Sequence, residues 1–124
     1  MSKLISYPIV VGQNPSNLTR GNRSSPSLKR LDNWMTRLSI ERWSFINASY
    51  ADVATYDSVN WEVLELARGY SKIVALGQFA SSALTRISIS HFQLPHPSPL
   101  NRKLNDPTYE KTVLRQCYNY LHED

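Results

Sequence analysis

Apolar and polar residues alternate in blocks along this chain, and the blocks predict strands and helices in turn. Four stretches predict strands: LISYPIVVG (4–12), RWSFINAS (42–49), SKIVALG (71–77) and HFQLP (91–95). The first and third are apolar runs that stop at a glycine, Gly12 and Gly77. Such runs are typical of strands buried on both faces of a parallel sheet.

Between the predicted strands, apolar residues recur at the three- and four-residue spacing of helices. A helix over 27–39 has four apolar residues on one side, Leu28, Leu31, Met35 and Leu38. Ser25 or Ser27 is its expected N-cap.

Three further helices are predicted after the second strand. The first covers about 55–69 and ends near Gly69. Its apolar side is expected to carry Val59, Val63, Leu66 and Tyr70. The other two cover 78–87 and about Pro107 to His122.

Strands and helices therefore alternate, except for the polar segment QNPSNLTRGNRSSPS (13–27), which reads as a loop. This order predicts an α/β fold: a three-layer α/β/α domain with a four-stranded, mostly parallel sheet. With 124 residues, the chain is expected to form a single domain, residues 1–124.

Composition places the chain among ordinary globular proteins, with 41% hydrophobic and 19% charged residues. No apolar run approaches the roughly 18 residues of a membrane span. The N-terminus lacks the apolar core of a signal peptide, so an intracellular, cytoplasmic location is expected. Cys117 is the lone cysteine, which excludes an internal disulfide, and it is expected to be a small buried residue of the last helix.

The formal net charge of +4 is unevenly distributed. Five basic residues and one acidic residue lie between Arg20 and Arg37, whereas the stretch from Asp52 to Glu65 is acidic. A basic stretch of this kind suits a polyanion, usually nucleic acid. The alternative is a solvated face with no ligand.

Polar groups gather where the predicted strands end, as GQNPS (12–16), INAS (46–49) and PHPSPLN (95–101). Three prolines restrict the backbone around His96, which suits a side chain that must be held in place. Amides and an imidazole can read hydrogen-bonding edges and stabilise developing negative charge. The ordinary alternatives are turn residues for Asn14 and Asn47 and a core histidine for His96. No phosphate-binding glycine motif, metal-ligand motif or pair of catalytic carboxylates is present.

Two of these segments, VVGQNPS and LPHPSPLN, resemble the two signature motifs of the uracil-DNA glycosylase superfamily. SPSLKRLDNWM and IVALGQFASSAL resemble segments that lie between those motifs in the family, so the likeness runs in order over nearly the whole chain. The resemblance implies a uracil-DNA glycosylase-like fold. It also implies an enzyme that flips a nucleotide out of single- or double-stranded DNA and hydrolyses the N-glycosidic bond of uracil or a related pyrimidine. Such an enzyme is expected to act as a monomer in DNA repair, with no metal, cofactor or membrane.

The resemblance also assigns roles to individual residues. His96 would donate a hydrogen bond to the departing base, and Asn14 would orient the attacking water. The base would be bound by Gln13, Phe45, Asn47 and Ser16. Contacts to DNA would come from Ser27, Ser98 and the wedge residue Leu100. On account of their charge, phosphate contacts are also expected from the cations Arg20, Arg23, Lys29, Arg30 and Arg102.

The chain departs from the classical family pattern at three points. Asn14 stands where that branch has an aspartate, so the water would be positioned without being deprotonated. Ser16 replaces a tyrosine, which opens the pocket near C5 of the base and would admit a C5-modified or mismatched pyrimidine. No aromatic residue lies between Pro15 and Trp34 to stack on the base. Phe45 could take that role, although a place in the core is the more ordinary expectation.

Two other functions remain open at this point. A non-catalytic relative could keep the fold and bind DNA, a nucleobase or a protein partner. An unrelated nucleotide-binding α/β module would bind free nucleotides in preference to DNA.

Overall fold

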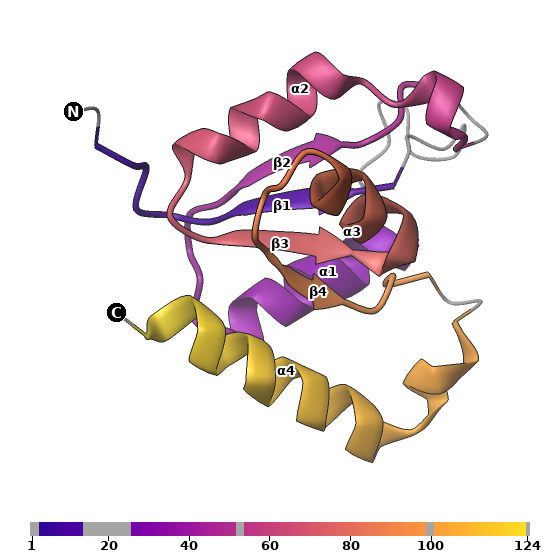
Figure 1. The fold of residues 1–124 in the computed structure, drawn as a ribbon. Helices are drawn as coiled ribbons and strands as arrows, with labels where there is room; N and C mark the ends of the chain where they lie inside the picture. Colours follow the sequence, from indigo (N-terminus) through magenta and orange to yellow (C-terminus); the bar gives the residue numbers. More distant parts are fainter. Residues whose placement is uncertain (1–2, 14–25, 52–53, 99–100, 124) are drawn as a thin grey trace.

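The computed structural model describes residues 3–13, 26–51, 54–98 and 101–123. Its four strands form one all-parallel sheet in the order β2–β1–β3–β4 (Figure 1). The strands are β1 (Ile9–Gly12), β2 (Ser44–Asn47), β3 (Ile73–Leu76) and β4 (Phe92–Leu94). The helices are α1 (Pro26–Arg37), α2 (Trp61–Glu65), α3 (Gly77–Arg86) and α4 (Pro107–His122), with 3₁₀ turns η1 (Tyr56–Ser58), η2 (Leu66–Gly69) and η3 (Arg102–Asn105).

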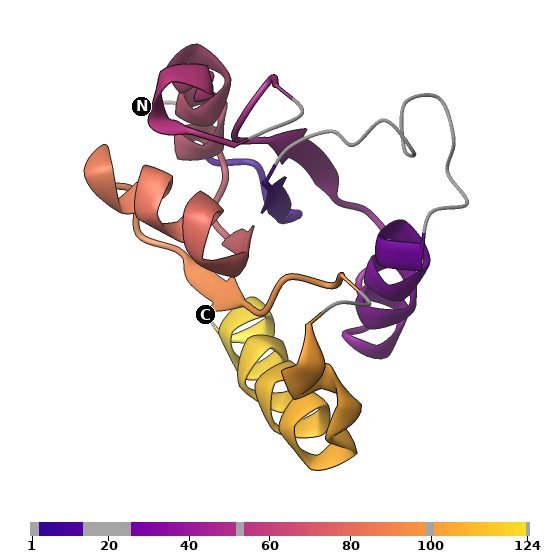
Figure 2. The ribbon, with the colours of Figure 1, turned by 90° about the vertical axis from the view of Figure 1, so that its right-hand side faces the viewer.

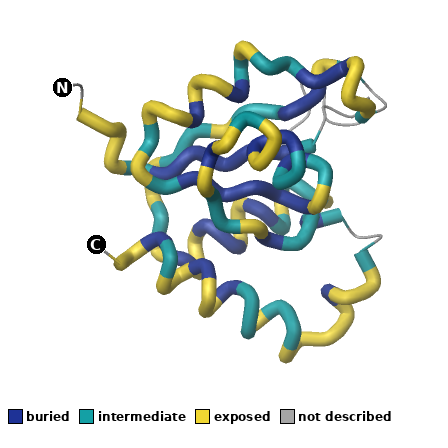
Figure 3. Tube along the Cα trace, in the orientation of Figure 1, coloured by how far each residue is buried: buried dark blue, intermediate teal, exposed yellow. Residues whose placement is uncertain are grey.

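Helices cover both faces of the sheet, which gives the predicted three layers (Figure 2). Because strand side chains alternate in direction, Ile9 and Val11 pack toward α2 and α3, and Val10 packs toward α1 and α4. The strands carry much of the buried surface (Figure 3). The sequence therefore predicted the fold class correctly.

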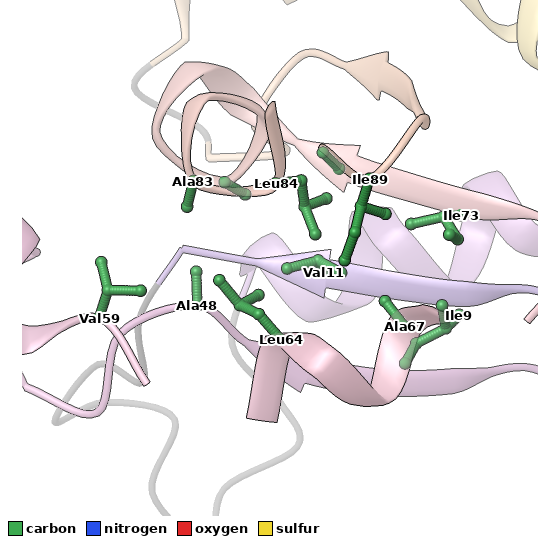
Figure 4. Packing of buried hydrophobic residues seen from close by; sticks show 12 residues of the cluster. Ile9, Val11, Ala48, Val59, Leu64, Ala67, Ile73, Ala83, Leu84 and Ile89 are labelled. Carbon is green, nitrogen blue, oxygen red and sulfur yellow. The ribbon is translucent and has the colours of Figure 1, made fainter. Parts of the chain in front are cut away.

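The α2/α3 side of the core combines branched aliphatic residues with alanines (Figure 4). Five alanines lie in it: Ala48, Ala67, Ala75, Ala80 and Ala83. Small side chains let the helices approach the sheet closely.

The α1/α4 side has larger residues, and side-chain hydrogen bonds join its two helices. Trp34 of α1 is fully buried, and its indole Nε1 donates to Oε2 of Glu110 on α4 over 3.1 Å. Arg37 donates to the other carboxylate oxygen over 2.9 Å. Cys117 is buried as predicted, and its burial raises the pKa of the thiol to about 12.

The predicted helix over 55–69 is wrong as a continuous element. Val59 forms an antiparallel bridge with Ser49, so the chain is extended between η1 and α2. Asn60 then caps α2, its side chain accepting from the Val63 N–H over 3.2 Å. The predicted apolar side also shifts, because Leu66 is 59% exposed while Leu64 and Ala67 are fully buried.

Two element boundaries also differ from prediction. The first strand is four residues long, and Ile5 makes only an isolated bridge to Tyr70. Ser27 lies inside α1, which begins at Pro26, and the alternative cap Ser25 lies outside the described residues. No helix in the described ranges is both long and apolar enough to cross a membrane.

Candidate functional site

The carboxyl ends of the strands meet at one edge of the sheet, which faces the viewer in Figure 2. Gly12 of β1 is in register with Asn47 of β2, and Leu76 of β3 with Leu94 of β4. The pairing of the first two strands continues past their ends, because Ser49 N donates to Gln13 O over 2.8 Å. Ligands of open parallel sheets bind at this edge, and three of the predicted site segments start here.

His96 lies just beyond β4 and is half-buried. Its Nδ1 accepts the Ser98 backbone N–H over 3.1 Å. Burial lowers the pKa of His96 below its ordinary value of 6.5, so the ring is neutral at pH 7. Since Nδ1 accepts, the proton of the neutral ring is on Nε2. Within the described residues Nε2 has no hydrogen-bond partner, so it is an available donor.

Asn101 holds the loop that carries His96. Its Nδ2 donates to the His96 carbonyl oxygen over 3.1 Å, and its backbone N donates to Ser98 O over 3.0 Å. Its Oδ1 accepts from Lys103 N over 3.3 Å, which ties the loop to η3. The stiffness expected from the prolines is therefore reinforced by hydrogen bonds.

Gly77, the first residue of α3, packs directly against His96. It has a φ of +88°, and a Cβ built on it would lie 3.2 Å from the Cβ of His96. A side chain at this position would be strained and would push the imidazole away. Gly77 and Asn101 are thus positioning residues to which the sequence analysis gave no role, although they lie in the segments IVALGQFASSAL and PHPSPLN.

Phe45 and Asn47 lie together over Gly12. A Cβ on Gly12 would come within 2.7 Å of Phe45 Cζ and 2.9 Å of Asn47 Oδ1, so this glycine makes room for both side chains. Phe45 is 36% exposed and contacts Trp43 edge-on at 6.3 Å between ring centroids. The expectation of a core role for Phe45 is therefore wrong. β2 is an edge strand of the described sheet, and its residue Phe45 leaves part of its ring exposed.

The amide of Asn47 makes no hydrogen bond to any described residue, and neither does the side chain of Gln13. Both residues are half-buried. Two amides and one imidazole N–H at one sheet edge offer donors and acceptors to a flat polar ligand such as a nucleobase.

Only some of the other predicted contact residues lie in the described part of the chain. Ser27 is half-buried in the first turn of α1, and Lys29 and Arg102 are exposed. Arg30 donates to Ser98 O over 3.5 Å, so this cation lies against the His96 loop. The remaining predicted residues, Asn14, Ser16, Arg20, Arg23 and Leu100, lie outside the described residues.

A separate hollow of about 820 Å³ lies beside the C-terminal end of α1, between Asp32, Met35, Thr36, Ser39, Ile40, Glu41 and Trp43. It contains none of the predicted site residues. Among the described residues, no group of three or more His, Cys, Asp or Glu could hold a metal ion.

Comparison with known proteins leaves the family unassigned: no family model and no curated protein matches this chain. The functional argument therefore depends on the residues themselves.

Proposed function

We propose that this protein is a DNA glycosylase that hydrolyses the N-glycosidic bond of uracil or a related pyrimidine. The observation that carries the proposal is the state of His96: a neutral, loop-held imidazole with Nε2–H as a donor at the carboxyl edge of the sheet. The motif resemblance of GQNPS and HPSPLN supports the same conclusion.

In this reaction the bond between C1′ of the deoxyribose and N1 of the base breaks, and its electron pair leaves with the base. Water adds to C1′, its oxygen forming the new bond, and the released proton neutralises the base anion. The products are an abasic site and the free base. Stabilising the anionic base lowers the barrier, as donors do in an oxyanion hole.

Each site residue has one task in this scheme. His96 Nε2–H donates to a carbonyl oxygen of the departing base, where negative charge develops. Asn47 offers its amide to the polar edge of the flipped base, and the exposed ring of Phe45 offers a stacking surface beside it. Asn14 orients the water, Ser16 leaves space near C5, and Leu100 fills the gap in the duplex, as the resemblance implies.

The test is excision from labelled oligonucleotides that carry uracil, a thymine mismatch or a 5-modified pyrimidine, in single- and double-stranded form. His96→Ala should lower the excision rate by about 10²–10³ because it removes the donor to the charged base. His91→Ala is the matched control, since His91 bonds Ser81 and the Ile89 carbonyl, with no bond to the 96–101 loop. Circular dichroism of both variants checks that they fold.

Excision by the native protein that survives His96→Ala would contradict the assigned mechanism. No excision of any of these bases, with DNA affinity unchanged by His96→Ala, would instead favour the non-catalytic relative. Tight binding of free nucleotides without DNA binding would favour the unrelated module.

A further inference from the structure

One face of α4 carries a stripe of hydroxyl and basic side chains that the reading of the sequence did not identify. Thr108, Lys111, Thr112 and Arg115 occupy positions i, i+3, i+4 and i+7, which places them on one side of the helix. Together with Pro107 they line an open groove of about 370 Å³.

The two cations of this groove are available to a ligand. Lys111 and Arg115 are exposed, and neither forms an ion pair within the described residues. Of the neighbouring acids, Glu110 is paired with Arg37 of α1, and Asp106 caps the helix by accepting from the Thr108 N–H over 2.9 Å. The side chains that line the groove themselves carry two positive charges and no negative charge.

Along the chain, this stripe follows the candidate site. η3 comes after the His96 loop and exposes Arg102 and Lys103, and α4 then runs back along the sheet (Figure 1). From Thr108 to Arg115 the helix rises about 10 Å. That length corresponds to about three phosphates along one strand of a duplex.

The opposite helical layer has a different charge. Residues 26–37 and 102–122, which contain α1, η3 and α4, hold seven Lys or Arg and three Asp or Glu. Residues 56–69 and 77–86, which contain α2 and α3, hold two Lys or Arg and three Asp or Glu. Among these four segments, the excess of basic residues thus lies in the α1/α4 layer, whose Arg30 contacts the His96 loop.

We propose that the groove formed by Thr108, Lys111, Thr112 and Arg115 binds the sugar-phosphate backbone of DNA flanking the base held at His96. Hydroxyls and cations are the usual phosphate-contacting set. Tyr118 is the one exposed large apolar side chain of α4 among the described residues, whereas a membrane surface would require a broad apolar face. The inference rests on the proposed function, since it extends the path of the same DNA along α4.

The test compares Lys111→Gln/Arg115→Gln with Arg68→Gln/Arg86→Gln, which removes the same two charges from the opposite layer. DNA affinity is measured by fluorescence anisotropy at several salt concentrations with two probes. The short probe carries the target base with too little flanking DNA to reach α4, and the long probe is extended on both sides of that base. We expect the α4 variant to bind the extended DNA at least tenfold more weakly, with a salt dependence reduced by about two phosphate contacts. The short oligonucleotide should bind as before, and the control should change less than twofold.

An equal loss of affinity for both oligonucleotides, or a loss no larger than in the control, would overturn the inference. His96→Ala separates it from the proposed function, because that change should lower the excision rate by about 10²–10³ and leave DNA affinity intact. If the native protein excises a base but the α4 variant binds the extended DNA normally, the DNA-binding role of the groove is wrong and the glycosylase proposal stands. If the α4 variant loses affinity but the native protein excises no base, the groove binds DNA in a protein that is not a glycosylase.

Discussion

The two faces of the sheet are covered in different ways. On the α1/α4 face, large side chains fill the space, and Trp34 reaches a carboxylate on the neighbouring helix. On the α2/α3 face, alanines allow close contact with short helices, and the buried hydroxyls of Ser49 and Ser58 bond each other over 2.7 Å. The first face is also the basic one.

Phe45 and Asn47 of the candidate site lie on the α1/α4 face. Phe45 is in register with Val10, whose side chain packs on that face, and Asn47 follows two residues later. Arg30 of α1 contacts the His96 loop, and η3 and α4 continue from that loop. In the proposed function, the α1/α4 face therefore presents Phe45, Asn47 and Arg30 to the ligand, whereas the α2/α3 face mainly closes the core.

The largest expected effect on stability comes from a cavity in the core of the α1/α4 face. Trp34→Ala should lower the free energy of unfolding by about 3–5 kcal/mol, because it leaves a cavity and removes the donor to Glu110. The same change at Trp61, which is only partly buried on the other face, should cost about 1–2 kcal/mol. Urea unfolding of both variants measures the difference, and equal losses would remove the contrast between the faces.

A smaller effect on stability, with a clear effect on activity, is expected at Gly77. Gly77→Ala should cost about 1–2 kcal/mol because the residue has a positive φ. Excision should also fall, since the new Cβ would press on His96. Gly69→Ala is the control, because a Cβ there meets nothing within 4 Å. If Gly77→Ala excises at the native rate, the support of His96 by Gly77 is not needed for function.

The smallest effect is expected from the charge of Glu110. Hydrogen bonding from Arg37, together with that from Trp34, lowers the pKa of this carboxyl below its ordinary value of 4.5. Its contribution to stability is therefore full above pH 4.5 and is lost as the pH falls through the lowered pKa. Glu110→Gln should cost about 0.2–1 kcal/mol at pH 7, since the pair is partly exposed.

Melting temperatures of the native protein and Glu110→Gln, measured from pH 7 to pH 3, test this contribution. The two curves should converge as the carboxylate is protonated. A constant gap between them would show that the charge of Glu110 does not contribute.

Much of the fold could be predicted from local pattern. Continuous apolar runs mark strands that are buried on both faces, and the helix from Pro107 to His122 begins and ends where its Asp106 cap and its spacing indicate. The break between η1 and α2 could not be predicted in this way. It depends on a bridge between Ser49 and Val59, a tertiary contact that overrides the helical spacing of Val59 and Val63.

The same division holds for the candidate site. The sequence by itself determined which groups stand at the strand ends, because parallel strands bring successive carboxyl ends to one edge. Only the tertiary structure decided that His96 is neutral with its proton on Nε2, since burial and the Ser98 N–H set that state. It also decided that Phe45 is exposed, because exposure depends on what packs against an edge strand and not on the residue type.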